Sequence, residues 1–318
     1  MLRAMDSAVA GLRAHQNKLD VIGHNIANVN TFGFKSQIYS FQEAMYQTTN
    51  ASAGGTNSAG GTNAAQFGYG ALMGSISMDM TASTPTYMGG LNASINGDGF
   101  FITYVTPDLS IDVSTDGNVI KKTDFDYTRV GQFKLDSNGY LVDGNGKFVY
   151  GFQKTDGPQS GTDAYNGSIV PLRAPKGGQT GSTISYASAG DDVLELTNVQ
   201  INKLGEITAV VKSTNKDIDG KTVSLGKVAI ATFQNPEGLT KKGQYYYGAN
   251  ENDNTGKTSA TRPGGSTSDL MTGYLEASNV DLATEFSNMI TTQRGFQANS
   301  KMITVSDEIL NELVNMKR

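Results

Sequence analysis

The chain has 318 residues, 38 of them glycine and 7 proline, and its formal net charge is -5. This acidic balance argues against a nucleic-acid-binding protein, whose usual mark is a basic face. The sequence contains no cysteine, so disulfides, cysteine-ligated zinc and thiol catalysis are excluded. A chain of this length suggests about two or three domains.

The first thirty residues predict an amphipathic helix. Apolar residues recur there at alternating three- and four-residue steps, with Gln16 and Gly23 at the interrupted positions, which is the stripe of an amphipathic or coiled-coil helix. Charged residues interrupt the segment, so it lacks the continuous apolar region of a cleaved secretory signal. The predicted seam consists of Leu2, Met5, Val9, Leu12, Leu19 and Ile26.

The stretch NIANVNTFGFK, Asn25 to Lys35, follows this helix. Asn and Gly tolerate the left-handed conformation, so local rules predict a helix terminus. We expect Asn25, Asn28 and Thr31 to bond neighbouring backbone. Residues 31–75 are expected to form a linker and extended loop. They include a glycine-rich segment at 48–66 with two copies of SAGGTN.

Residues 76–265 predict a compact antiparallel β domain. Short β-prone runs alternate with Asn-Gly and Asp-Gly pairs, including Asp116-Gly117, which favour tight turns with positive φ. A small insertion is expected at 154–190, and residues 250–277 are expected to be a return linker. The predicted strands are SISMDM, LNASI, GFFITYV, FDYTRV, QFKL, YLVD, KFVYGF, VLELTNVQI, ITAVVK, VSLGKVAIATF and QYYYG.

The end of the chain again predicts a helix with an apolar seam, capped by Ser278 or Asn279. Neither terminal helix is stable alone with such a seam in water, so each needs a partner, which is the other helix or another copy. We expect an α+β fold in which residues 1–30 and 278–318 pair in a coiled-coil-like core. The second seam consists of Leu282, Phe286, Met289, Phe296, Ile303, Leu310 and Val314.

No motif in the sequence predicts catalysis. His15 and His24 are about 900° apart on a helix, so they lie on opposite faces and cannot share a metal ion. Gly220-Lys221-Thr222 resembles the end of a P-loop, but Asn215 stands where that motif needs glycine. We therefore expect neither an enzyme nor a bound cofactor or metal.

Both ends of the chain resemble the flagellar rod and hook family. The N-terminal pattern N-x-A-N-x-x-T-x-G-F-K is carried by Asn25, Asn28, Thr31, Gly33, Phe34 and Lys35. The C-terminal block, Ser278 to Arg318, contains RGFQANSK with Arg294, Phe296 and Asn299. Between them, INGDGFF and TRVGQFKLDSNGYLV resemble the family's shared β domain.

This resemblance implies a subunit of a hollow helical homopolymer, with the terminal helices as inner cylinder and the β domain outside. Both seams and both motifs would then be assembly residues, and Lys35 would contact an adjacent subunit. The implied partners are further copies, the distal rod, hook cap and hook–filament junction proteins, and the type III export apparatus. The implied location is extracellular, reached without a cleaved signal peptide. Neither nucleic-acid binding nor membrane insertion is expected.

Within the family the C-terminal block resembles the hook branch, since the distal rod branch more often has Ala-Tyr in place of Gly295-Phe296. The shortness of the chain and the loop at 48–66 keep the distal rod as an alternative. A remote alternative is an exported cell-wall hydrolase, which predicts a pair of carboxylates in a cleft.

Overall fold

The computed structural model describes residues 2–55, 60–107, 111–112, 125–159, 164–177, 184–188, 190–250, 252–264 and 268–316. The predicted turn at Asp116-Gly117, part of the SAGGTN repeat, and the side chains of Leu2, Ile111 and Asp112 lie outside this description. The chain divides into two compact units. Unit 1 comprises Met1–Val29, Lys35–Asp79 and Val280–Arg318, and unit 2 comprises Asn30–Phe34 and Met80–Asn279.

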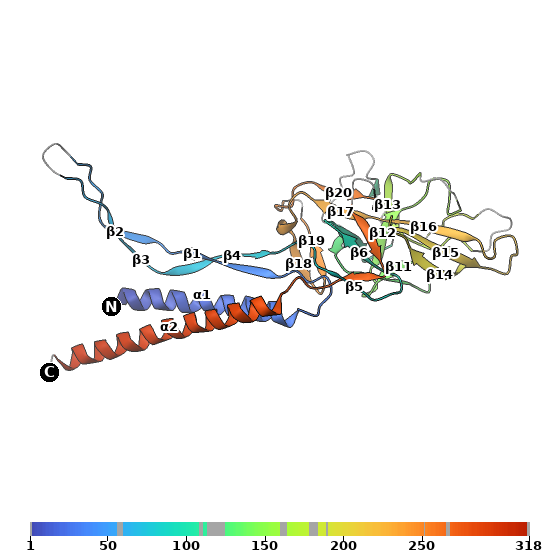
Figure 1. The fold of residues 1–318 in the computed structure, drawn as a ribbon. Helices are drawn as coiled ribbons and strands as arrows, with labels where there is room; N and C mark the ends of the chain where they lie inside the picture. Colours follow the sequence, from blue (N-terminus) through green and yellow to red (C-terminus); the bar gives the residue numbers. More distant parts are fainter. Residues whose placement is uncertain are drawn as a thin grey trace. The chain divides into compact units, whose positions relative to one another are not determined.

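Two helices from the ends of the chain form the centre of unit 1. In Figure 1, α1 (Leu2–Ala27) and α2 (Leu282–Asn315) lie side by side and run in opposite directions. The cap of α2 is Asp281 rather than Ser278 or Asn279, because its carboxylate accepts the N–H of Ala283 at 3.0 Å. Both predicted terminal helices are therefore confirmed, with a corrected start for the second.

A long β ribbon completes unit 1. Strand β1 (Gln37–Glu43) pairs with β4 (Ala71–Met78), and β2 (Tyr46–Asn50) pairs with β3 (Ala65–Gly68), all antiparallel. Strands β1 and β4 run beside α1 (Figure 1). The prediction of a linker and loop over 31–75 is therefore wrong where these four strands lie. The end of β4 was predicted as a strand, in SISMDM, but that part of the strand belongs to unit 1 and not to the β domain expected at 76–265. The rest of the ribbon was missed because its strands show no alternation of buried and exposed residues.

Unit 2 is built on a large antiparallel sheet, as the turn-rich sequence predicted. Its main path runs β18-β19-β9-β7-β12-β11-β10-β6-β21, and a separate pair joins β22 to β5. The predicted return linker at 250–277 is wrong, since β20, β21 and β22 lie in it.

The strands of unit 2 are β5 (Pro85–Tyr87), β6 (Asn92–Asn96), β7 (Phe100–Tyr104), β8 (Ile111–Asp112), β9 (Asp126–Thr128), β10 (Gly131–Leu135), β11 (Leu141–Asp143), β12 (Phe148–Phe152), β13 (Ser168–Pro171), β14 (Glu195–Ile201), β15 (Glu206–Lys212), β16 (Thr222–Val228), β17 (Ile230–Phe233), β18 (Thr240–Gly243), β19 (Tyr246–Gly248), β20 (Thr258–Thr261), β21 (Asp269–Thr272) and β22 (Tyr274–Glu276). A short 3-10 helix, η2, spans Pro236–Gly238.

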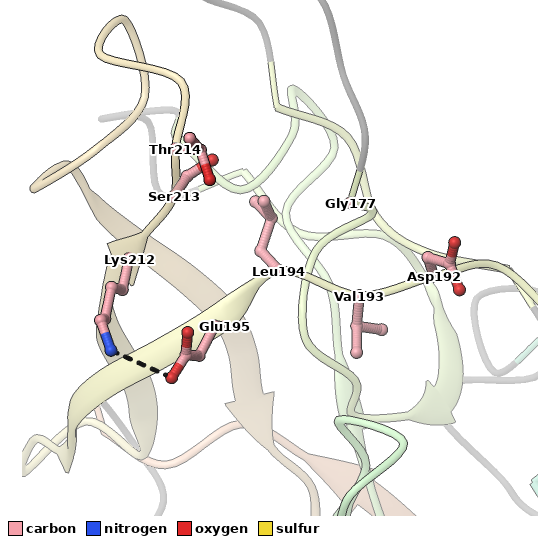
Figure 2. A pocket seen from close by; sticks show the side chains of 8 residues that line it. All are labelled: Gly177, Asp192, Val193, Leu194, Glu195, Lys212, Ser213 and Thr214. Atoms are coloured by element: carbon pink, nitrogen blue, oxygen red, sulfur yellow. Dashed lines mark hydrogen bonds and ion pairs between the residues drawn. The ribbon is translucent and has the colours of Figure 1, made fainter.

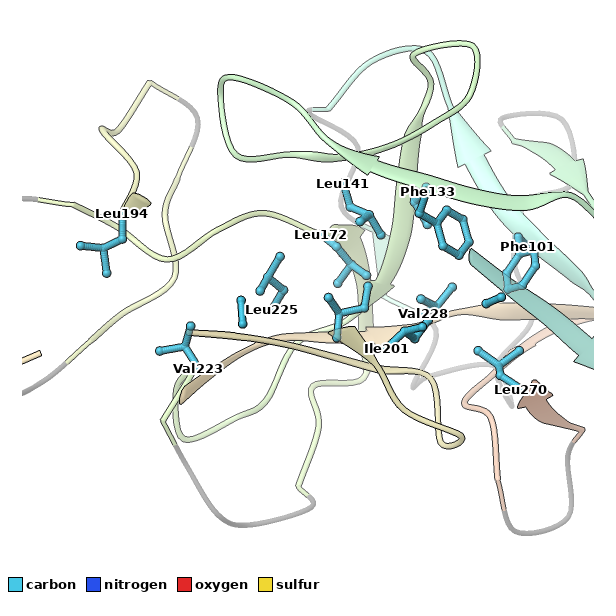
Figure 3. Close-up of a cluster of buried hydrophobic side chains, with 14 of the residues drawn as sticks. Phe101, Phe133, Leu141, Leu172, Leu194, Ile201, Val223, Leu225, Val228 and Leu270 are labelled. Atoms are coloured by element: carbon cyan, nitrogen blue, oxygen red, sulfur yellow. The ribbon is translucent and has the colours of Figure 1, made fainter. Parts of the chain in front are cut away.

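A contiguous apolar core holds unit 2 together. In Figure 3, the rings of Phe101 and Phe133 lie near Leu141 and Leu172, and the two rings meet edge to face at 5.1 Å. The predicted turn glycines Gly139 and Gly146 adopt positive φ values of 75° and 83°. The short β-prone runs and the turn pairs between them therefore predicted the sheet of this unit.

Candidate assembly surface

The terminal helices pair through a stripe of small and polar residues. A Cβ added to Gly11 of α1 would lie 2.6 Å from the side-chain nitrogen of Asn299 in α2. A Cβ added to Gly295 of α2 would lie 2.7 Å from Cε1 of His15 in α1. The stripe on α2 continues through polar residues, so the predicted coiled-coil core of interlocked apolar seams is not confirmed. Its buried or half-buried members are Glu285, Asn288, Thr292, Gly295, Asn299 and Ser306.

His15 lies where three elements of unit 1 meet. Its ring touches Gly295 of α2 and contacts Phe41 of β1 edge to face, with centroids 5.3 Å apart. Burial, with a smaller effect of the nearby Lys18 cation, lowers the pKa of His15. Its Nδ1 is buried and, among the described residues, has no hydrogen-bond partner. The imidazole therefore fills this junction as a neutral ring.

Asn25 joins the end of α1 to the other elements of unit 1. Its side chain, 1% exposed, donates to the carbonyl of Gln37 and to Oε1 of Glu285, each at 2.9 Å. It also accepts the N–H of Gln37 at 2.9 Å. The predicted bonding of this motif asparagine to backbone is confirmed, and a link to the first turn of α2 is added.

The remaining motif residues differ in exposure. Asn28 donates to the carbonyl of His24 at 2.9 Å, which confirms its predicted bond to backbone. Thr31 is exposed. Gly33, at φ 67°, donates its N–H to the carbonyl of Glu276, and an added Cβ would meet Val130 at 2.6 Å.

Phe34 and Lys35 are both interior side chains. Phe34 is buried beneath the Lys241 ammonium, which lies 4.1 Å from its ring centroid. Lys35 is only 1% exposed. The expected contact between Lys35 and an adjacent subunit stays a prediction, and a single chain leaves almost none of this side chain accessible for it.

Most residues of the two predicted seams lie to one side of the pairing stripe, although Ile303 and Leu310 share the face of α2 that holds Glu285 and Thr292. Successive helix residues are about 100° apart, so Leu12 and Leu19 point to one side of the face that holds Gly11 and His15. The exposed seam residues are Val9, Leu282, Phe286 and Val314, and Arg294 is also exposed. The half-buried ones are Met5, Leu12, Leu19, Ile26, Met289, Phe296, Ile303 and Leu310.

Further exposed apolar residues of unit 1 did not enter the predicted seams. One set lies on the second half of α2, at helical three- and four-residue steps, and the other lies on the ribbon. The spacing of the set on α2 could have been recognised in the sequence, but the predicted seam on the same helix has the same spacing. The two sets are Met302, Val305, Ile309, Leu313 and Met316, and Ile38, Met45, Tyr46, Phe67, Leu72, Met73 and Ile76.

A pocket in unit 2 tests the hydrolase alternative. It has a volume of about 400 Å³ and carries Asp192 and Glu195 in its lining. Figure 2 shows Glu195 turned toward Lys212, with a separation of 3.3 Å, and Asp192 at the other side of the pocket. Glu195 and Lys212 are both largely exposed, which is typical of a surface ion pair. The hydrolase alternative instead predicts two carboxylates that face each other in a cleft, so this pocket does not favour hydrolysis.

The described residues also bear on two other types of site. They contain no cluster of three or more His, Asp or Glu residues arranged to hold a metal ion. None of the described helices combines the length and the apolar character needed to cross a membrane.

Comparison with known proteins places both helical ends in one class of protein. The family described as Flagella basal body rod protein matches residues 5–35, and the family described as Flagellar basal body rod FlgEFG protein C-terminal matches residues 271–316. These segments contain most of α1 with its motif, and α2. They define an axial protein of the bacterial flagellum.

Relatives extend the similarity over the whole chain. Flagellar basal-body rod protein FlgG of Bacillus subtilis is 38% identical over 326 residues, covering 100% of both chains. Flagellar basal-body rod protein FlgG of Buchnera aphidicola from Acyrthosiphon pisum is 31% identical over 98% of this chain and 99% of its own. Flagellar hook protein FlgE of Borreliella burgdorferi is 27% identical over 460 residues, covering 100% of both. The chain belongs to the flagellar rod and hook family.

Proposed function

We propose that this protein is the subunit of the flagellar hook, which polymerises helically into a hollow, flexible tube. The tube couples the rod to the filament and transmits torque while it bends. The proposed role is purely structural, without catalysis. It follows from the chain's membership of the rod and hook family together with the hook-type residues of its C-terminal block.

The observation that carries the hook assignment is the contact of Gly295 with His15. The distal rod branch more often has alanine at the position of Gly295. Here an alanine Cβ would stand 2.7 Å from Cε1 and 2.9 Å from Nε2 of His15. Phe41 also contacts the His15 ring edge to face, with the ring centroids 5.3 Å apart. Gly295, the glycine of the hook-type motif, is thus the residue for which the packing against His15 of α1 leaves room.

The exposed seams support assembly into a polymer. An apolar stripe on a helix is stabilised only when something covers it. Here the pairing of α1 with α2 leaves Val9, Phe286 and Val314 exposed. Further copies of the chain are the partners that we propose for them, with the predicted seams as assembly residues.

The distal rod subunit is the second candidate. The FlgG proteins of Bacillus subtilis and Buchnera align with the chain over nearly equal lengths. The alignment with the Borreliella hook protein is 460 residues long against 318, so that protein has insertions absent here. A distal rod would use the same surfaces in a rigid drive shaft.

The proposed partners are other copies, the distal rod, hook cap and hook–filament junction proteins, and the type III export apparatus. The proposed location is the extracellular part of the flagellum. We propose that the N-terminal region carries an uncleaved export signal. Partners of a different kind, such as nucleic acid or a membrane, form no part of this proposal.

Gene deletion followed by electron microscopy of isolated flagellar bases distinguishes the two candidates. Loss of a hook subunit leaves a rod with its rings and no hook, whereas loss of a distal rod subunit stops assembly earlier. Immunogold labelling of a tagged, functional copy provides a second readout. Label along the hook is expected, and label confined to the rod would replace the hook assignment with the rod assignment.

A further inference from the structure

Helix α2 continues beyond the start of α1. Helices α1 and α2 run in opposite directions with a constant register. Gly11 faces Asn299, His15 faces Gly295 and Asn25 bonds Glu285, so the two residue numbers of each facing pair add up to the same value. By that register, Leu2 at the start of α1 lies opposite Glu308. The last two turns of α2 therefore have no part of α1 beside them, as Figure 1 also shows.

An apolar stripe runs along this half of α2. Met302, Val305, Ile309, Leu313 and Met316 follow steps of three and four residues, which places them on one face. They are between 36% and 80% exposed. Over fourteen residues the stripe is about 21 Å long at the rise of an α-helix. We call it the α2 end stripe.

A groove of matching character lies between α1 and β4. Exposed Val9, Leu72 and Met73 line it, and the small side chains of Ala10 and Ala14 leave a volume of about 380 Å³. Its lining on α1 extends from Asp6 to Asn17, about 16 Å along the helix. The groove therefore accommodates roughly three turns of an apolar helix face.

The α2 of the same chain cannot occupy this groove. Gly11 faces α2, and Arg13 lines the groove. Two helix positions are about 200° apart, so these residues lie on nearly opposite sides of α1. A helix already paired along one side of α1 does not reach the other side. The occupant must come from outside the chain.

The charges favour a second copy as the occupant. Residues 302–316 of α2 contain Asp307, Glu308 and Glu312 and no basic residue, ahead of Lys317 and Arg318 at the chain end. On the groove side, Arg13 and Asp6 are both exposed and lie seven residues apart, so an acidic helix flank has to lie at the Arg13 end, about 10 Å along α1 from Asp6. Glu308 and Glu312 are four residues apart on one flank of the α2 end stripe, so both can lie along that arginine.

We propose that the α2 end stripe of one copy docks in the groove between α1 and β4 of a second copy. This inference rests on the proposed polymer. Leu313 and Ile309 enter beside Leu72 and Met73, and the acidic flank lies along Arg13. Each copy presents one groove and one end stripe, so the contact is head-to-tail and continues from copy to copy.

Cysteine cross-linking tests this docking, since the chain has no cysteine of its own. The full-length variant Leu72→Cys/Ile309→Cys is expressed in the deletion strain, and assembled flagellar bases are isolated and oxidised. A disulfide requires Cα atoms within about 7 Å, so only a docked pair links. A ladder of covalent multimers on a non-reducing gel is expected. The matched control is Leu72→Cys/Phe286→Cys, whose second cysteine replaces another exposed apolar residue of α2, and no ladder is expected from it.

The outcomes separate this inference from the proposed function. Intact assemblies without a ladder, or with the ladder only in the control, overturn the docking and leave the axial function standing. A protein absent from flagellar structures overturns the function itself. As a second arm, Arg13→Glu should abolish assembly, and combining it with Glu308→Arg and Glu312→Arg should restore it. Failure of this restoration in a folded triple variant counts against the docking.

Discussion

Gly295 of α2 lies directly against the imidazole of His15 in α1, with no space for even a methyl group between them. The two residues are at opposite ends of the sequence, so this contact joins the N-terminal and C-terminal family signatures. Phe41 of the ribbon holds the ring from a different direction. One glycine thus sets how closely the two terminal helices approach.

Gly295→Ala is expected to destabilise unit 1, although alanine is the better helix former by about 1 kcal/mol. Overpacking against His15 costs about 1–3 kcal/mol and outweighs that gain. Urea unfolding followed by circular dichroism measures the free energy of unfolding. Gly23→Ala is the matched control, because no atom lies within 4 Å of its added Cβ, and it should stabilise.

The double variant His15→Ala/Gly295→Ala isolates the contact itself. Removal of the ring makes room for the methyl group, so alanine at 295 should cost less in the His15→Ala background. The difference between the two costs is the coupling energy of the pair. Equal costs in both backgrounds would show that the ring does not determine the need for glycine.

Unit 1 should lose stability as the pH falls below about 6.5. The pKa of His15 is lowered in the folded chain, so the unfolded chain binds the proton more tightly. The stability from the neutral ring is complete above the unfolded pKa and declines as the pH falls toward the folded pKa. Unfolding free energies between about pH 7.5 and 5 check this against His15→Gln. The inference fails if both proteins show the same slope in this range.

Asn25→Ala should cost about 2–4 kcal/mol, because it leaves both backbone groups of Gln37 without this partner in a part-buried place. Asn28→Ala is the matched control. Asn28 also bonds one backbone carbonyl, but in an exposed place, so its loss should cost about 1 kcal/mol or less. Chemical unfolding of both variants gives the comparison, and similar costs would contradict the role assigned to Asn25.

Phe296→Glu should block assembly while unit 2 stays folded. Phe296 is half-buried beside the pairing stripe, and a carboxylate there cannot be covered by another copy without loss of hydration. Electron microscopy of complemented cells measures assembly, and the strand signal in circular dichroism measures folding. Leu12→Glu tests the seam of α1 in the same way. Normal tubes formed with both seams charged would refute the assembly role.

Local patterns predicted the elements better than their contacts. The helical spacing from Met5 to Ile26 located α1, and turn pairs such as Asn138-Gly139 marked the strand ends, because both signals depend on near neighbours. The pairing face of the helices was not predicted. Gly11, His15 and Asn299 stand outside both predicted seams, and their packing against the opposite helix is visible only in the structure.

Most of the candidate assembly residues could be named from the sequence, yet their division into interior and surface could not. The buried motif residue Asn25 looks no more apolar in the sequence than exposed Thr31. Burial depends on segments more than two hundred residues away, such as Glu285 for Asn25 and Lys241 for Phe34. No local rule reaches that far.

The hydrogen bond between Asn25 and Glu285 spans 260 positions of the chain. A contact this distant forms only after a large loop closes, which makes it slow and places it late in folding. While the polypeptide is being synthesised, α1 therefore emerges long before its partner exists. Unit 1 becomes complete only when about the last eighth of the protein is made. The order of the two helices along the chain thus delays the completion of unit 1 until almost the whole molecule is present.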